Sequence, residues 1–232
     1  MCGRFSLKEA EVRKVAVRFR ATVDARLSAE PMRPRYNIAP TQNVLTVRME
    51  GEERVLGSLK WGLVPSWAKD ASVGNQMTNA RAETVRERLA YRQLFRTKRC
   101  LVPCDAFYEW TGERAAKQPY AFARADGALF AIAGLWDAWS DPKSGAVLET
   151  VTLITTQPNA MVSVIHDRMP AILHEADEEA WLTDKPDAAA ALLRPFGGDM
   201  QSWPVSRRLN SARFDDESLI VPVRVSEQPE LF

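Results

Sequence analysis

The stretch 99-RCLVPCDAFYEW-110 opens the middle part of a chain of 232 residues, and its apolar and aromatic residues are typical of β-strands. The same pattern continues in 120-YAFARA-125, 129-LFAIAGLWDAW-139 and 149-ETVTLITT-156. In an extended strand Phe107 and Glu109 lie on one face, so this face is not simply a solvent face. A carboxylate in such surroundings tends toward a raised pKa, which is useful for proton transfer.

The sequence on either side of this middle part predicts both helices and strands. Helical periodicity runs through 7–20 and 81–95, and 175–194 predicts one or two short helices with an acidic start. We expect strands in 43–49 and 54–65, an ordered proline-rich loop in 28–42, and hairpin turns in 124–129 and 144–149. No linker divides the chain, which predicts one α+β domain with a mostly antiparallel, barrel-like sheet and a loose tail at 225–232.

Composition limits the class of protein. With 46% hydrophobic and 26% charged residues the chain is an ordinary globular one, and its net charge of +1 neither favours nor excludes a polyanionic partner. No apolar run reaches the roughly 20 residues that span a bilayer, and the start lacks the apolar segment of a secretory signal. The three cysteines form a sparse, odd set that suits a reducing compartment. We therefore expect a cytoplasmic protein without membrane contact.

Cys2, which directly follows the initiator methionine, is the most unusual residue of the chain. Chain starts are usually frayed, so we expect an exposed thiol there. Removal of Met1 would give Cys2 a free α-amine, with a pKa of about 8, beside a thiol with a pKa of about 8.5. Such a 1,2-aminothiol condenses with an aldehyde to an imine, and its sulfur then closes a thiazolidine ring. Without that chemistry, Cys2 is a thiol of no consequence.

Two other chemistries could use these cysteines. Class II glutamine amidotransferases also begin with a cysteine and a glycine, but the "NGE" and "RGPD" motifs expected for glutamine binding do not occur here. A zinc site could draw on Cys100, Cys104, His166 and His174. The spacing of these four residues is unlike the two tight pairs of most zinc sites, and buried thiols explain both internal cysteines. We expect neither a metal nor a cofactor.

Further polar residues stand in settings that suit a site. Asn79 and Arg81 precede a predicted helix, where an asparagine could equally be a helix cap. His166 lies in the polar turn 165-IHDRMP-170, whereas a lone histidine is more often structural. Basic residues gather in 81–99, and tryptophans occur in 60-KWGLVPSWAKD-70. Together they could bind phosphates and stack on bases, although a solvated helix face and core tryptophans would also account for them.

Ten short motifs, in order, resemble those of the SRAP (SOS response-associated peptidase) family. They are MCGRF, RYNIAPTQ, WGLVPSW, NARAET, CLVPCDAFYEW, KQPYAF, AIAGLW, TLITT, IHDRMP and WPVSRRLN, and they run through nearly the whole chain. The resemblance implies one SRAP domain over 1–224, with a twisted barrel-like β core flanked by helices. It also implies a monomer that processes abasic sites in single-stranded DNA, in the cytoplasm or at a bacterial nucleoid.

Residue roles follow from the same resemblance. The resemblance implies an enzyme with autopeptidase and lyase-like chemistry. It implies that the protein removes its own Met1 and that Cys2 then forms a thiazolidine with the ring-opened sugar of an abasic site, which shields the lesion. Asn79 orients the Cys2 amine or the sugar, Glu109 moves protons, and His166 assists ring opening and reversal. DNA contacts are expected from Arg4, Asn37, Pro40, Trp67 and Arg81. Some members carry a second tryptophan where this chain has Ala68, which affects base stacking and not the chemistry.

Two further hypotheses remain open from the residues alone. The same basic and aromatic surface would suit a non-catalytic reader of modified or damaged DNA, which would bind equally well without Cys2. A cysteine peptidase, for which removal of Met1 is the visible activity, would turn over unrelated peptides.

Overall fold

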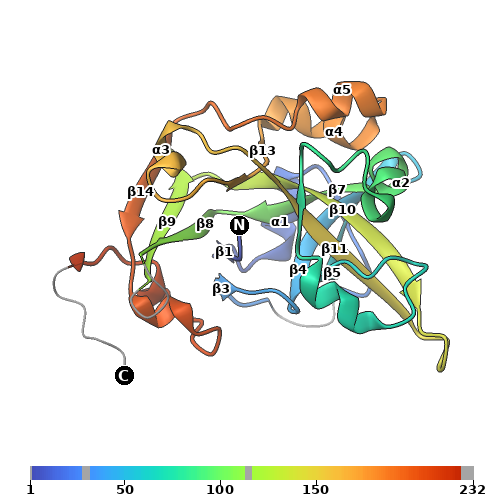
Figure 1. Ribbon diagram of the computed structural model, residues 1–232, viewed down its shortest axis with the longest axis horizontal. Coiled ribbons are helices and arrows are strands. Elements are labelled where there is room, and N and C mark those ends of the chain that lie inside the picture. Colours follow the sequence, from blue (N-terminus) through green and yellow to red (C-terminus); the bar gives the residue numbers. More distant parts are fainter. Residues whose placement is uncertain (1, 28–31, 113–116, 226–232) are drawn as a thin grey trace.

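The computed structural model describes residues 2–27, 32–112 and 117–225, and Figure 1 shows its two β-sheets side by side. The strands are β1 (Arg4–Leu7), β2 (Thr22–Val23), β3 (Arg35–Ile38), β4 (Asn43–Glu50), β5 (Glu53–Trp61), β6 (Asn79–Arg81), β7 (Arg99–Cys104), β8 (Ala106–Thr111), β9 (Gln118–Arg124), β10 (Phe130–Ser140), β11 (Val147–Thr156), β12 (Met169–Pro170), β13 (Ile172–Leu173) and β14 (Met200–Pro204).

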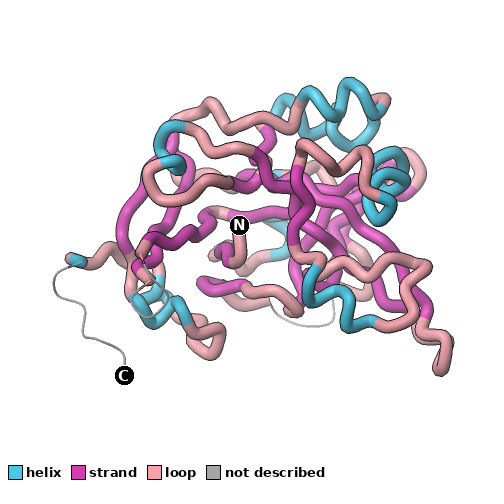
Figure 2. Tube along the Cα trace, in the orientation of Figure 1, coloured by secondary structure: helices cyan, strands magenta, loops and turns pink. Residues whose placement is uncertain are grey.

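Helices are short and lie around the sheets, as Figure 2 shows. The α-helices are α1 (Val12–Arg18), α2 (Leu89–Thr97), α3 (Ala160–Ser163), α4 (Glu178–Thr183) and α5 (Pro186–Ala191), with 3-10 turns at Ala71–Gln76, Glu175–Asp177, Arg207–Asn210 and Glu217–Leu219. In the described ranges no helix is long and apolar enough to cross a membrane.

Five strands of the larger sheet close into a barrel. Its order β5-β4-β7-β10-β11 is antiparallel throughout, and β11 returns to pair with β5 in parallel, with Val151 opposite Trp61. The interior is filled by large side chains such as Leu56, Trp61 and Leu101, which are completely buried. Burial of this apolar surface is the main source of the fold's stability.

The second sheet has the order β14-β9-β8-β1-β3 and shares its core with the barrel. Phe5 of β1 packs on Trp61 at the end of β5, with ring centroids 5.3 Å apart. β6 and β12 are attached to the barrel through β11. The start of the chain is therefore held at the seam between the two sheets.

The expected α+β fold with a mostly antiparallel, barrel-like sheet is confirmed, while several boundaries were wrong. The helix expected over 7–20 is shorter, because Leu7 still belongs to β1. Within 28–42, the residues Arg35–Ile38 form β3 and 28–31 lie outside the described residues. The helix expected over 81–95 begins only at Leu89.

The two predicted hairpins had different outcomes. The turn at 144–149 connects β10 to its neighbour β11. The turn at 124–129 leads from β9 into β10, which belongs to the other sheet, so no hairpin forms there. The short helices expected over 175–194 are present as α4 and α5. The expected tail falls almost wholly on 226–232, outside the described residues.

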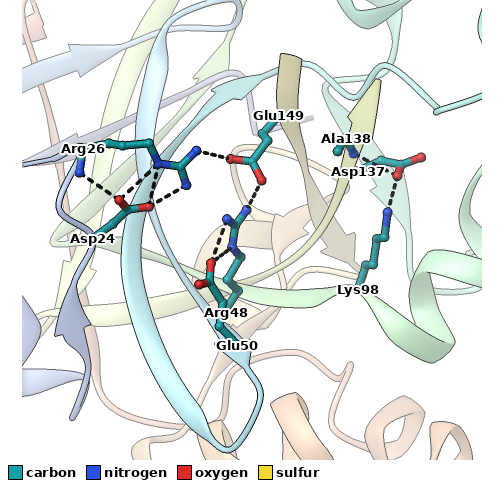
Figure 3. Close-up of polar contacts among 8 residues, drawn as sticks. All are labelled: Asp24, Arg26, Arg48, Glu50, Lys98, Asp137, Ala138 and Glu149. Carbon is teal, nitrogen blue, oxygen red and sulfur yellow. Dashed lines mark hydrogen bonds and ion pairs between the residues drawn. The ribbon is translucent and has the colours of Figure 1, made fainter. Parts of the chain in front are cut away.

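A chain of ion pairs crosses the outside of the barrel (Figure 3). Arg48 of β4 binds Glu149 of β11 at 2.7 Å and stacks on Trp136, with 4.3 Å between the guanidinium carbon and the ring centroid. Glu149 also accepts from Arg26, which binds Asp24 at 2.6 Å. These contacts join β4, β11 and the segment after β2 without touching the seam.

Candidate active site

Cys2 lies two residues before the start of β1 and is completely buried, which corrects the expectation of an exposed thiol. The start of the chain does not fray because β1 is paired on both sides, by β3 and by β8. Since Arg4 pairs with Tyr108, Cys2 comes alongside the part of β8 that carries Glu109. Burial and the Glu109 carboxylate both raise the pKa of the Cys2 thiol, which keeps it protonated.

Asn79 reaches Cys2 from the other sheet. It begins β6, which pairs in parallel with β11, and Leu153 lies opposite it. Its side-chain Nδ2 donates to the Cys2 carbonyl oxygen at 2.9 Å and to Thr78 Oγ1 at 3.3 Å. Its Oδ1 is buried and has no hydrogen-bond partner among the described residues. Asn79 thus fixes the main chain of Cys2 and keeps an acceptor available beside it.

Glu109 supplies a carboxyl group whose protonation changes near neutral pH. The residue is 1% exposed, and desolvation, with a smaller effect of the Asp167 carboxylate, raises its pKa to about 7. A buried strand position between Tyr108 and Trp110 produces this environment, as the sequence pattern indicated. Such a group can both donate and accept a proton at physiological pH.

His166 is the next titratable group outward from Glu109. Its Nε2 lies 3.8 Å from Glu109 Oε2, and its side chain is 26% exposed. Burial lowers the pKa of His166, and its Nδ1 accepts a 3.0 Å hydrogen bond from the main-chain N–H of Arg168. The bond from Arg168 favours the neutral tautomer with its proton on Nε2, the atom that faces Glu109, whereas Asp167 Oδ1, 3.0 Å from Nδ1, favours a proton on Nδ1.

Arg168 is a residue that the sequence analysis did not single out. Its main-chain N–H orients His166, and its guanidinium binds Glu83 at 2.6 Å and the carbonyl of Thr155 at 2.6 Å. These contacts fasten the loop that carries His166 to β11 and to the segment after β6. Its place directly after 166-HD-167 in a polar turn was the available signal.

Arg4, which is half-buried, and Asn37 point toward each other. Arg4 Nη1 donates to Asn37 Oδ1 at 2.7 Å and to the Leu209 carbonyl at 2.9 Å. Asn37 is completely buried, and its Nδ2 donates to the carbonyls of Leu209, Ser211 and Phe214. This network binds β1 and β3 to the C-terminal segment, so Asn37 has a structural position.

Trp67 is 68% exposed, and it lies on a loop whose main chain is fixed by hydrogen bonds on both sides of it. On one side of it, the Ser66 N–H donates to Asp137 Oδ2 at 2.7 Å; on the other, Trp139 Nε1 donates to the Ala68 carbonyl at 2.7 Å. Asp137 is itself held by Lys98 Nζ at 2.6 Å (Figure 3). A large exposed ring on a fixed backbone is suited to stacking.

The base of the same loop requires glycine. Gly62 has φ +121°, and a Cβ there would lie 2.5 Å from the carbonyl oxygen of Gly74. Of the remaining predicted DNA contacts, Arg81 is exposed and Pro40 is half-buried.

The four candidate zinc ligands do not come together in one site. Cys100 and Cys104 are buried in β7, and His174 stacks on Phe196 with ring centroids 4.7 Å apart. Among the described residues no three His, Cys, Asp or Glu side chains gather as metal ligands would. His166 joins Glu109 instead.

The arrangement defines a class of site: a cysteine at the start of the chain, with a carboxyl group and a neutral imidazole that can exchange protons beside it. Residues 1–212 match the family model described as SOS response associated peptidase (SRAP), and the chain belongs to this family. The resemblance expected from the ten motifs is therefore confirmed.

Several known proteins are similar to this chain. It is 42% identical over 225 residues to the abasic site processing protein YoqW of Bacillus subtilis (strain 168), covering 95% of this chain and 99% of that one. It is 35% identical to the abasic site processing protein HMCES of Gallus gallus, covering 100% and 80%. A crystal structure of a protein from Bacteroides thetaiotaomicron matches with a TM-score of 0.86 at 28% identity, over 96% of this chain and 100% of that one.

Proposed function

We propose that this protein processes abasic sites in single-stranded DNA by forming a thiazolidine between Cys2 and the ring-opened sugar. The relatives named above as abasic site processing proteins support the general function. The observation that carries the proposal is the convergence of Asn79 and Glu109 on Cys2 at the seam between the sheets. Nothing about a buried structural thiol would require a carboxyl group with a pKa of about 7 beside it.

The reaction requires that Met1 be removed first, because the Cys2 nitrogen is otherwise an amide and not a nucleophile. Hydrolysis of the Met1–Cys2 bond releases methionine and frees the α-amine. The amine then adds to the C1′ aldehyde, and loss of water gives an imine. Addition of the Cys2 sulfur to the imine carbon closes the ring, while the thiol proton ends on the nitrogen.

Glu109 is the group we assign to the proton transfers. In its acid form it protonates the hydroxyl that leaves as water, and in its carboxylate form it takes the proton of the Cys2 thiol. The second task is needed because burial keeps that thiol protonated. For ring opening, the imidazolium form of His166 would protonate the ring oxygen of the sugar through Nε2, while the Glu109 carboxylate takes the proton of the C1′ hydroxyl. This leaves Glu109 in the acid form that the later loss of water needs.

Exposed side chains would bind the DNA strand around the lesion. Trp67 offers a stacking surface, and Arg81 offers a cation two residues from Asn79. Pro40 is half-buried and suits a smaller apolar contact. We assign Arg4 and Asn37 an indirect part, in which their hydrogen-bond network holds β1 and hence Cys2 in place.

The test is a denaturing gel of the purified protein mixed with an oligonucleotide that carries one abasic site. We expect a covalent product with the wild-type protein and none with Cys2→Ala. Intact-mass measurement should show the chain without Met1 and, after incubation, an adduct that has lost one water. A wild-type protein that binds the strand but gives no covalent product would identify a non-catalytic reader of damaged DNA.

A further inference from the structure

The basic segment 81–99 separates into two groups of side chains. Arg86 forms an ion pair with Asp187, and Lys98 one of 2.6 Å with Asp137. Arg99 is buried and donates to main-chain carbonyls, among them that of Phe95 at 2.7 Å. These three residues have structural partners and are not available to a ligand.

The second group consists of exposed arginines without partners. No described residue forms a side-chain hydrogen bond or ion pair with Arg81, Arg88, Arg92 or Arg96. Arg92 and Arg96 are one turn apart on α2 and therefore share a face, which places like charges side by side. Such a pair is unfavourable for the free protein, so we looked for what it could bind.

A groove lies beside this face of α2. It has a volume of about 590 Å³ and is lined by Arg92 and Arg96 from α2, with Pro186 and Asp187 from the start of α5. Asp187 is held by Arg86, which lines the same groove. Within the segment 81–99 itself, the acidic residues are Glu83, which is bound by Arg168, and Glu87. The groove therefore keeps an excess of positive charge.

The groove is continuous in the chain with the candidate active site. Asn79 of β6 binds the main chain of Cys2, Arg81 ends the same strand, and Arg88 precedes the first residue of α2. In Figure 1, the teal-green segment that follows residue 81 leads directly into α2. Along the chain, these arginines therefore follow directly after the strand that carries Asn79.

We propose that Arg88, Arg92 and Arg96 form a track, entered from Arg81, for the phosphate backbone of the strand that continues beyond the lesion. This inference rests on the proposed function. Guanidinium groups bind phosphate oxygens well, and such contacts read no base sequence. The track extends the bound strand past Trp67 and Arg81 and makes affinity depend on the length of that strand.

The experiment measures non-covalent binding to single strands that carry a tetrahydrofuran abasic analogue, whose sugar cannot open. One strand is short, and two others extend it by about ten nucleotides on one side or the other, within the usual size of a single-strand site. The test variant is R92E/R96E. R13E/R20E is the matched control, because Arg13 and Arg20 are also exposed and without side-chain partners, and the change in net charge is the same.

We expect the wild-type protein and the control to bind one extended strand several-fold more tightly than the short one, and R92E/R96E to lose that gain. The slope of log K against log salt should fall by about 1.4 in R92E/R96E, since a phosphate contact on single strands contributes about 0.7. R92Q/R96Q, which adds no negative charge, should change in the same direction. Equal affinities and salt slopes for the test and control variants would overturn the track.

Covalent capture separates this inference from the proposed function. The wild-type protein is also mixed with a natural abasic strand and analysed on a denaturing gel. If binding depends on strand length and requires Arg92 and Arg96 but no covalent product forms, the phosphate track is supported and the proposed chemistry is refuted. Covalent product without a difference between the two variants would refute the track alone.

Discussion

The side-chain amide of Asn79 donates a 2.9 Å hydrogen bond to the main-chain carbonyl of Cys2, across 77 residues of sequence. Asn79 belongs to a strand attached to the barrel, and Cys2 leads into the other sheet. This one contact therefore aligns the proposed nucleophile with the barrel. Because it holds the main chain and not the thiol, it positions Cys2 and leaves the sulfur and the α-nitrogen free to react.

Asn79→Ala should slow covalent capture more than it destabilises the fold. The lost hydrogen bond is worth about 0.5–1.5 kcal/mol, and because 1.36 kcal/mol corresponds to a tenfold change in rate, we expect capture to slow by about twofold to tenfold. The measurement is the single-turnover rate of crosslinking to an abasic oligonucleotide, with thermal unfolding measured in parallel.

Asn43→Ala is the matched control for this variant, because Asn43 is exposed in β4. It should crosslink at the wild-type rate. If Asn79→Ala also crosslinks at the wild-type rate, Asn79 has no positioning role.

Glu109 should make the protein less stable as the pH rises. Its folded pKa of about 7 lies above the unfolded value near 4.5, so between these values the folded state binds more protons. The free energy of unfolding therefore falls as the pH rises from about 4.5 to about 7. The total loss is about 3 kcal/mol: none of it is present below about pH 4.5, and all of it is present above about pH 7. Urea unfolding between pH 5 and pH 8, compared with Glu109→Gln, measures it.

Glu109→Gln should be more stable than the wild-type protein at pH 8 and should lose most of its crosslinking, because an amide cannot exchange the protons. At pH 5 the two proteins should have similar stability. A Glu109→Gln protein that shows the same fall in stability between pH 5 and pH 8 would mean that another group titrates.

The sequence predicted those parts of the fold and site that depend on local pattern. The long strands follow from their apolar and β-branched residues, and Glu109 stood out because a carboxylate in an aromatic strand is unusual. The barrel closure between β5 and β11 could not be predicted, since that parallel pairing joins segments about 90 residues apart. The burial of Cys2 was missed for the same reason, because it depends on pairing with β3 and β8.

The boundaries of α2 and the place of Asn37 also depended on tertiary contacts. Residues 82–88 fit a helical pattern, but β6 pairs with β11 up to Arg81 and the chain needs a turn before α2 begins. From the sequence, Asn37 is expected to be a polar loop residue. In the structure it is surrounded by Arg4 and by three carbonyl groups that are distant in the sequence. No local signal identifies such partners.

Asp137→Ala should release the loop that presents Trp67. The substitution removes the acceptor of the Ser66 N–H and leaves Lys98 without its ion-pair partner, which costs about 2 kcal/mol of stability. Affinity for single-stranded DNA should fall as well, approaching that of Trp67→Ala. Thermal unfolding and fluorescence anisotropy measure the two effects.

Asp141→Ala is the control, because Asp141 is a turn residue outside this loop that accepts from Ser144. It should leave DNA affinity unchanged. If Asp137→Ala is destabilised but binds DNA as tightly as the wild-type protein, the position of Trp67 does not depend on Asp137.

Asn37→Ala should act through stability and not through direct loss of a DNA contact. The variant leaves the main-chain carbonyls of Ser211 and Phe214 without their donor and removes one of the acceptors of Arg4, in a place that solvent does not reach. Leaving buried polar groups unpaired costs about 1–3 kcal/mol, so we expect a clearly lower melting temperature. Below that temperature, single-strand affinity should stay near the wild-type value. Arg81→Ala provides the opposite pattern, since its exposed side chain forms no hydrogen bond or ion pair with a described residue, and its loss should weaken binding at nearly unchanged stability. An Asn37→Ala protein with wild-type stability and reduced affinity would instead place Asn37 on the DNA, as the family resemblance first suggested.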